Sequence, residues 1–292
     1  MTYAMKSPAH HRPSARLTLA LSVFFVVALN AAGQDPAGRE LSSGLTAVNA
    51  VSGITNPVTV TVIYDNYVHT QGMTADWGYS IVIEGLDSTV LFDTGTKPEL
   101  FRSNLDKTGL NASAIDLLVI SHEHYDHVGG IPAFVAMKTG ISVIIPHSFP
   151  AAMKEKLVSY GLKPLLVDDA AMICRHLYSS GEFDYPLAEQ ALVLDTKNGL
   201  VVMTGCSHPG IVEMLREIRK TFNKEIRMVF GGFHLMNKSD IEMASIIGEM
   251  KSIGVVKCGA THCTGDRQIK LIREAFGDNF FELGAGNTIV IN

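Results

Sequence analysis

The order of apolar and amphipathic stretches along residues 56–292 predicts a mixed α/β domain. Short β-branched or apolar runs predict strands, and longer stretches with an apolar face predict helices. The predicted strands cover residues 57–65, 79–84, 89–93, 115–120, 141–145, 190–195, 200–204, 227–230, 255–260, 279–283 and 287–291. The predicted helices cover residues 131–138, 151–160, 211–222, 240–253 and 266–276. Strand meanders interleaved with single helices indicate two packed sheets with helices outside, in one domain.

The N-terminal 33 residues have a different pattern. Lys6, Arg12 and Arg16 precede an apolar run at 17–29, which ends in Asn-Ala-Ala-Gly. This is the three-part layout of a secretory signal peptide, and the run is shorter than the roughly 20 residues that span a bilayer. An uncleaved membrane anchor is the alternative. We expect a signal peptide over 1–33, a linker rich in Gly, Ser, Ala and Pro over 34–55, and a periplasmic or secreted protein without a membrane segment after cleavage.

Charge narrows the class of partner. The chain carries a formal charge of −5, and residues 1–33 contain three basic and no acidic groups, so the mature chain has a charge of about −8. Such a surface repels phosphate backbones, which argues against a nucleic-acid partner and favours a small-molecule substrate. The four cysteines show no disulfide framework, and whether any of them pair does not follow from the sequence. The oligomeric state does not follow from the sequence.

Four candidate ligands lie within six residues directly after the predicted strand 115–120. They are His122, His124, Asp126 and His127, and a Gly-Gly pair follows. Imidazole and carboxylate donors at this density suit Zn²⁺, and also Mn²⁺ or Fe²⁺. The sequence therefore predicts a metal site on this loop.

This segment resembles the His-x-His-x-Asp-His signature of the metallo-β-lactamase superfamily, and 91–95, Leu-Phe-Asp-Thr-Gly, is similar to that family's Asp-Thr-Gly strand end. The resemblance implies an αββα sandwich with two divalent metal ions, zinc above all, at one edge of the two sheets. It assigns His122 and His124 to one metal and Asp126 and His127 to the other. Asp93 would orient a ligand histidine.

The later ligands are less regular. Thr-Gly-Cys at 204–206 resembles the turn that delivers the family's bridging aspartate, with Cys206 in its place, either as a ligand or as a small buried residue. The histidine that usually precedes this turn is missing. His208 is the preferred substitute, ahead of His147 and His176, because it lies two residues past Cys206 and on the same side of an extended backbone.

Two further histidines stand at predicted strand ends. His262, in Thr-His-Cys-Thr-Gly, resembles the family's last ligand. His234, in Gly-Gly-Phe-His-Leu, could contact substrate, ligate a metal or be structural. Together with Gly-Cys-Ser-His-Pro-Gly at 205–210 and Tyr-Asp-Asn-Tyr at 64–67, these segments resemble the branch named after 7,8-dihydropterin-6-methyl-4-(β-D-ribofuranosyl)aminobenzene-5'-phosphate synthase.

Hydrolysis by a metal-bound hydroxide is the default expectation, on a small ester, lactone, amide or phosphoester. Asp126 would orient the nucleophile or accept its proton, and His234 with the Ser207 hydroxyl would stabilise the oxyanion or hold the substrate. A metal-dependent transferase like the synthase is the alternative, with Tyr67, Trp77 and Tyr79 as an aromatic wall. A non-enzymatic metal-binding or redox-sensing module, centred on Cys206 and Cys263, is the second alternative.

Overall fold

The computed structural model describes residues 39–40, 53–54 and 56–292. The predicted signal peptide lies outside these residues, and so does the predicted linker except for positions 39, 40, 53 and 54, so both remain predictions. No helix within the described ranges is long and apolar enough to cross a membrane.

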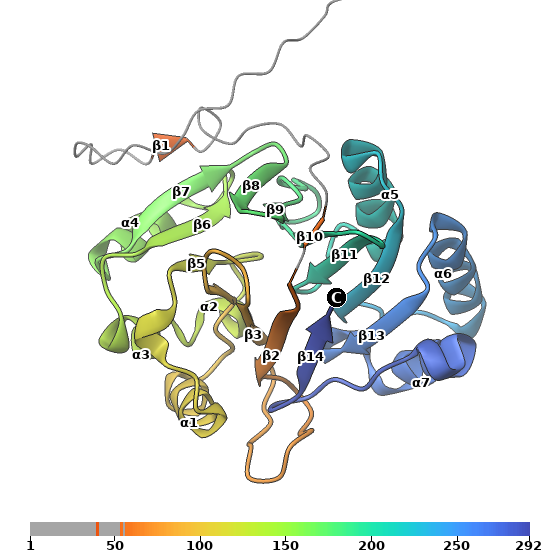
Figure 1. Cartoon of the computed structure of the whole chain (residues 1–292), viewed down its shortest axis with the longest axis horizontal. Coiled ribbons are helices and arrows are strands. Elements are labelled where there is room, and N and C mark those ends of the chain that lie inside the picture. The colour runs from red at the N-terminus through yellow and green to blue at the C-terminus, as the bar shows by residue number, and fades with distance from the viewer. Residues whose placement is uncertain (1–38, 41–52, 55) are drawn as a thin grey trace, which may run out of the picture.

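Two sheets form the centre of the molecule (Figure 1). The eight-stranded sheet has the order β1 (Arg39–Glu40), β7 (Lys163–Val167), β6 (Ser142–Pro146), β5 (Leu117–Val119), β4 (Val90–Phe92), β3 (Ser80–Glu84), β2 (Val58–Tyr64) and β14 (Thr288–Ile291). The six-stranded sheet has the order β13 (Lys257–Thr261), β12 (Ile226–Gly232), β11 (Gly199–Thr204), β10 (Leu192–Thr196), β9 (Leu177–Ser179) and β8 (Ala171–Cys174). Strands β4 to β7 run parallel to one another, as do β11 to β13, so their carboxyl ends gather at one edge of each sheet.

Helices cover the outer face of each sheet, which confirms the predicted αββα sandwich. On the side of the larger sheet lie α1 (Pro98–Thr108), α3 (Ile131–Met137) and α4 (Ala151–Ser159), and on the side of the smaller sheet lie α5 (Ile211–Phe222), α6 (Asp240–Ile253) and α7 (Asp266–Phe276). A short helix, α2 (Tyr125–Val128), follows β5. A buried cluster of apolar side chains lies between each sheet and its helices, and another lies between the two sheets.

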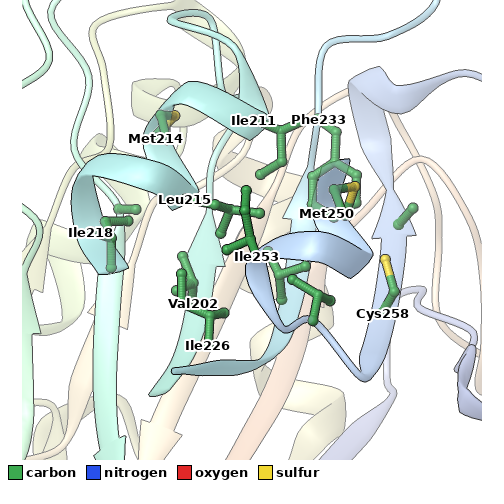
Figure 2. Close-up of a cluster of buried hydrophobic side chains, with 14 of the residues drawn as sticks. Val202, Ile211, Met214, Leu215, Ile218, Ile226, Phe233, Met250, Ile253 and Cys258 are labelled. Carbon is green, nitrogen blue, oxygen red and sulfur yellow. The ribbon is translucent and has the colours of Figure 1, made fainter. Parts of the chain in front are cut away.

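The two-residue period of each strand explains these layers. On β11, Val201 and Met203 pack between the sheets, whereas Leu200 and Val202 face the helices. Helix α5 presents one buried stripe to Val202, and Figure 2 shows it: Ile211, Met214, Leu215 and Ile218. This spacing of three and four residues is that of an amphipathic helix whose apolar face is its contact with the sheet.

The helix boundaries predicted at 240–253 and 266–276 coincide with α6 and α7. Ser239 caps α6, and its side chain and that of Glu242 complete a reciprocal capping box. The strand predicted at 279–283 is wrong. Residues Gly277–Asn279 form a 3₁₀ turn, and Phe280 makes only an isolated bridge to Cys258.

Other elements carry too weak a pattern to be predicted. Helix α1 buries only Phe101, Asn104 and Leu105, so its apolar stripe is narrow and contains an amide. The amide is buried because Asn104 donates to the carbonyl oxygens of Ile63 and Thr74. Tertiary hydrogen bonds of this kind leave no periodic signal in the sequence.

Candidate metal centre

Candidate ligands from both sheets meet where parallel strands end. The loop after β5 carries His122 to His127, and the loop after β11 carries Cys206 and His208. His234 follows β12, and His262 opens the 3₁₀ turn η3 (His262–Thr264) directly after β13. Because each of these loops leaves a carboxyl strand end, segments far apart in the sequence converge on one small volume.

Three histidines form a first group. The ligand nitrogens of His122, His124 and His208 all lie within 4.8 Å of one another. Their ring centroids are 4.8 Å apart for His122 and His124, 4.9 Å for His122 and His208, and 4.7 Å for His124 and His208. The Nε2 atoms of His122 and His208 are buried without a hydrogen-bond partner. Buried polar atoms are rarely left unpaired, so both nitrogens fit a metal ligand role.

A second group combines oxygen, nitrogen and sulfur. Asp126, His127, Cys206 and His262 are all buried, and their ligand atoms lie within 4.8 Å of one another. His127 Nε2 lies 3.2 Å from Cys206 Sγ and 3.7 Å from Asp126 Oδ2, and His262 Nε2 lies 3.3 Å from Asp126 Oδ2. This donor set suits zinc, which accepts all three ligand atoms.

Asp93 holds the ring of His127 from behind. Its Oδ2 lies 2.6 Å from His127 Nδ1, which leaves Nε2 facing the second group. Asp93 also accepts hydrogen bonds from the backbone N–H and the hydroxyl of Ser121, each at 2.7 Å. Burial alone would lower the pKa of His127, but the Asp93 carboxylate outweighs it and raises this pKa to about 9. A carboxylate partner of this kind fixes the tautomer and orientation of a metal-binding histidine.

Asn66 plays the same part for His262. Its Oδ1 lies 2.9 Å from His262 Nδ1 and accepts the N–H of Gly78 at 3.0 Å, and its Nδ2 donates to the carbonyl oxygen of His262 at 3.2 Å. These contacts hold His262 in a left-handed conformation, with φ at 51°. A β-region residue at this position would direct its side chain elsewhere.

Glu189 is a functional residue that the sequence did not point to. Its buried carboxylate accepts the backbone N–H groups of Cys206 and Ser207 through Oε1, at 2.9 and 2.7 Å, and that of His208 through Oε2, at 2.7 Å. Burial raises the pKa of Glu189 to about 7, against the effect of these hydrogen bonds. The turn is thereby fixed with Cys206 in the second group and His208 in the first. No short-range motif links Glu189 to this turn.

Several predicted roles change in the structure. Tyr79 is 0% exposed, so it cannot line a substrate pocket, whereas Trp77 is 38% exposed and its ring centroid lies 5.0 Å from that of His262. Ser207 is buried, and its hydroxyl donates to the carbonyl oxygen of Gly232 at 2.9 Å, so it is not available to stabilise an oxyanion. Tyr67 is half-buried, and its hydroxyl donates to Asp266 at 2.6 Å.

The remaining histidines divide clearly. His234 is exposed at the site, and its ring centroid lies 4.1 Å from that of His208. Among the described residues, His147 and His176 belong to no group of candidate metal ligands. His176 stands in the tight turn between β8 and β9, with φ at 68°. All four cysteines are buried and free.

Two adjacent groups of candidate metal ligands lie at one edge of the αββα sandwich, and the family comparison agrees with this arrangement. The sequence profile described as the metallo-beta-lactamase superfamily matches residues 74–209. The chain has the metallo-β-lactamase fold, and residues 74–209 are similar in sequence to the superfamily of that name.

Individual relatives narrow the similarity. The chain is 29% identical to the 7,8-dihydropterin-6-methyl-4-(beta-D-ribofuranosyl)-aminobenzene-5'-phosphate synthase of Methanocaldococcus jannaschii, over 73% of this chain and 89% of the synthase. It is also 29% identical to Tm1679, described as a metal-dependent hydrolase of the beta-lactamase superfamily, with a TM-score of 0.67 over 80% of this chain and 98% of Tm1679. YhfI of Bacillus subtilis, a metallo-beta-lactamase fold protein, shares the fold at 17% identity, with a TM-score of 0.60 over 80% of this chain and 99% of YhfI.

Proposed function

We propose that the protein is a binuclear metal-dependent hydrolase of a small ester, lactone, amide or phosphoester. The observation that carries this proposal is the pair of adjacent ligand groups, in which the buried Nε2 atoms of His122, His208 and His262 have no hydrogen-bond partner. Nitrogens left unpaired in this way are costly unless a cation uses them. The similarity to Tm1679 supports the hydrolytic reading.

The donor atoms favour zinc over manganese or iron at the second position. His122, His124 and His208 would hold one ion, and Asp126, His127, Cys206 and His262 the other. The sulfur of Cys206 makes the second set softer than the all-histidine first set. When bound, the ions would supply Lewis-acid polarisation of the substrate and a lowered pKa for a bound water.

Asp126 would orient the attacking water. Burial alone would raise its pKa, but the imidazole of His262, whose Nε2 lies 3.3 Å from Asp126 Oδ2, and the charge of His127 hold the pKa of this carboxyl well below its usual range. An ionised carboxylate is a hydrogen-bond acceptor only, so it would fix the position of a water O–H. His234 stands at the exposed side of the site, where it would contact either the substrate or an ion.

A transferase is the competing proposal, and two observations favour it. One is the 29% identity to the synthase, which covers most of both chains. The other is the exposed ring of Trp77 beside His262, which would stack on a planar heterocycle. This reaction would use the same ligands to bind a leaving group while water is excluded.

The substrate in either case would be a small molecule. A mature charge of about −8 disfavours nucleic acid. Export through the predicted signal peptide remains part of the proposal, and a cytosolic biosynthetic step would fit it poorly.

Metal analysis combined with turnover tests the proposal. We expect about two equivalents of zinc in the purified protein and a clear loss in the double variant His122→Ala/His124→Ala. His208→Ala should lose metal from the first position only. Turnover of esters, lactones or phosphodiesters that disappears in the double variant would support hydrolysis. Turnover only with a second, nucleophilic organic substrate would establish the transferase instead.

A protein that neither retains nor rebinds zinc or manganese at neutral pH would refute both enzymatic proposals. That result would leave the non-enzymatic module. Metal binding without turnover of any substrate class would also favour the module.

A further inference from the structure

Two donor side chains beside the binuclear groups are not used by them. They are Cys263 and His234, and their ligand atoms and that of Cys206 all lie within 4.8 Å of one another. Cys206 thus belongs to both the second group and this third one. The third group contains two sulfurs and one imidazole.

Local contacts and backbone conformation bring these donor side chains close together. Cys263 lies in the turn after β13, is 2% exposed, and its Sγ donates to the carbonyl oxygen of Cys206 at 3.6 Å. Gly232 leaves the space for the thiol, because a Cβ at that position would lie 2.8 Å from Cys263 Sγ. His234 has a φ of 50°, a left-handed conformation that is uncommon for a residue with a side chain. Backbone strain of this kind is tolerated mainly at functional sites.

The geometry matches a tetrahedral zinc site with one open position. Zinc–sulfur bonds of about 2.3 Å and tetrahedral angles give sulfur–sulfur separations of about 3.8 Å. Ligand atoms within 4.8 Å of one another therefore need only small side-chain adjustments to close on an ion. Two thiolates and one imidazole select soft or borderline ions such as Zn²⁺, Cd²⁺ or Cu⁺ over Mg²⁺ or Mn²⁺.

We propose that Cys206, His234 and Cys263 form a third cation subsite for a soft metal ion, with the Cys206 thiolate shared between this ion and the second one. The proposal rests on the proposed loading of the two main groups. His234 then acts as a ligand and not as a contact for substrate. Each thiol gives its proton to solvent as the sulfur–metal bond forms, so the step needs no oxidant or reductant.

Metal counting and cobalt spectroscopy of the full-length protein test this proposal. The parent should bind about three equivalents of Zn²⁺ or Co²⁺, and Cys263→Ser about two. In the cobalt form, Cys206 makes two sulfur–cobalt bonds and Cys263 makes one. Loss of the third ion in Cys263→Ser removes two of the three, so the near-ultraviolet thiolate-to-cobalt charge-transfer band should fall by more than half.

Two further variants control for folding. Cys258→Ala removes a fully buried thiol of β13, the strand that precedes the turn of Cys263. Cys258 belongs to none of the three ligand groups of the described residues, so this variant should leave the metal count and the band unchanged. His234→Asn changes an exposed side chain and keeps a residue that accepts positive φ, so this variant should fold. It should lose the third ion, and it therefore tests the proposal even if Cys263→Ser fails to fold.

Equal metal counts and equal band intensities in the parent, Cys263→Ser and His234→Asn would overturn the third subsite. That failure is distinct from failure of the proposed function. In the first case His122→Ala/His124→Ala still loses metal, and in the second the parent binds none.

Discussion

Replacing Glu189 by glutamine should loosen the turn that delivers Cys206 and His208. The carboxylate now accepts three backbone N–H groups inside the protein, two on Oε1 and one on Oε2. Glutamine keeps one acceptor oxygen and places an NH₂ group against one of the N–H donors. One buried N–H is thereby left unpaired and faces another donor, at a cost of about 1–3 kcal/mol in the free energy of unfolding.

The same substitution should also weaken metal binding. Groups that position metal ligands typically change metal affinity by about 10–100-fold when mutated, and Glu189 positions ligands of both main groups. Glu189→Ala should be worse than Glu189→Gln, because it leaves all three N–H groups unpaired. If Glu189→Gln keeps more zinc affinity than Glu189→Ala, the hydrogen bonds of residue 189 position the ligands.

The assay combines urea unfolding of the metal-free protein with zinc competition against a chromophoric chelator. Glu182→Gln is the matched control, since Glu182 also accepts one backbone N–H, that of Ser148, but at an exposed position. It should change neither quantity measurably. Parent-like stability and zinc affinity in Glu189→Gln would refute the assignment.

Three other predictions concern Asp93, Phe230 and Trp77. Without metal, burial opposes protonation of His127 but Asp93 raises its pKa to about 9, so zinc affinity should rise with pH up to that value as the competing proton leaves. Asp93→Asn should bind zinc more weakly and should release about one proton fewer when zinc binds at neutral pH. Calorimetry in buffers of different ionisation enthalpy measures this proton release, and an unchanged release would contradict the prediction. Phe230→Ala removes a fully buried ring between the sheets and should cost about 3–5 kcal/mol in chemical unfolding, and a cost below 1 would show that the core refills the space. Trp77→Ala should raise KM with little change in kcat or stability, and an unaltered KM would exclude the ring from substrate binding.

The features that the sequence predicts best are those whose signals lie within a few residues of one another along the chain. The ligands from His122 to His127 stand within six residues of one another, so their convergence needs only one loop. Helix α6 could be bounded because Ser239 and the apolar period are local signals. Glu189 and Asn66 could not be found in this way, because each reaches a partner that only the tertiary fold brings near.

The same distinction explains the wrong roles. Ser207 follows a ligand and carries a hydroxyl, which favoured contact with substrate, but its left-handed backbone turns that hydroxyl towards Gly232. Tyr79 lies on the edge of a strand segment that could face either layer, and it packs between the sheets. Side-chain direction at such positions depends on a single backbone dihedral or on the register, and neither is visible in composition.

Both main groups of candidate ligands combine side chains from both sheets. His124 and His127 follow a strand of the larger sheet, whereas His208 and His262 follow strands of the smaller one. A bound ion would therefore link the two sheets at the open edge of the sandwich. The distance between the sheets would then set the distances between the ligand atoms of each group. Core side chains such as Met203, which separate the layers, would then tune metal affinity from a distance, by their volume alone.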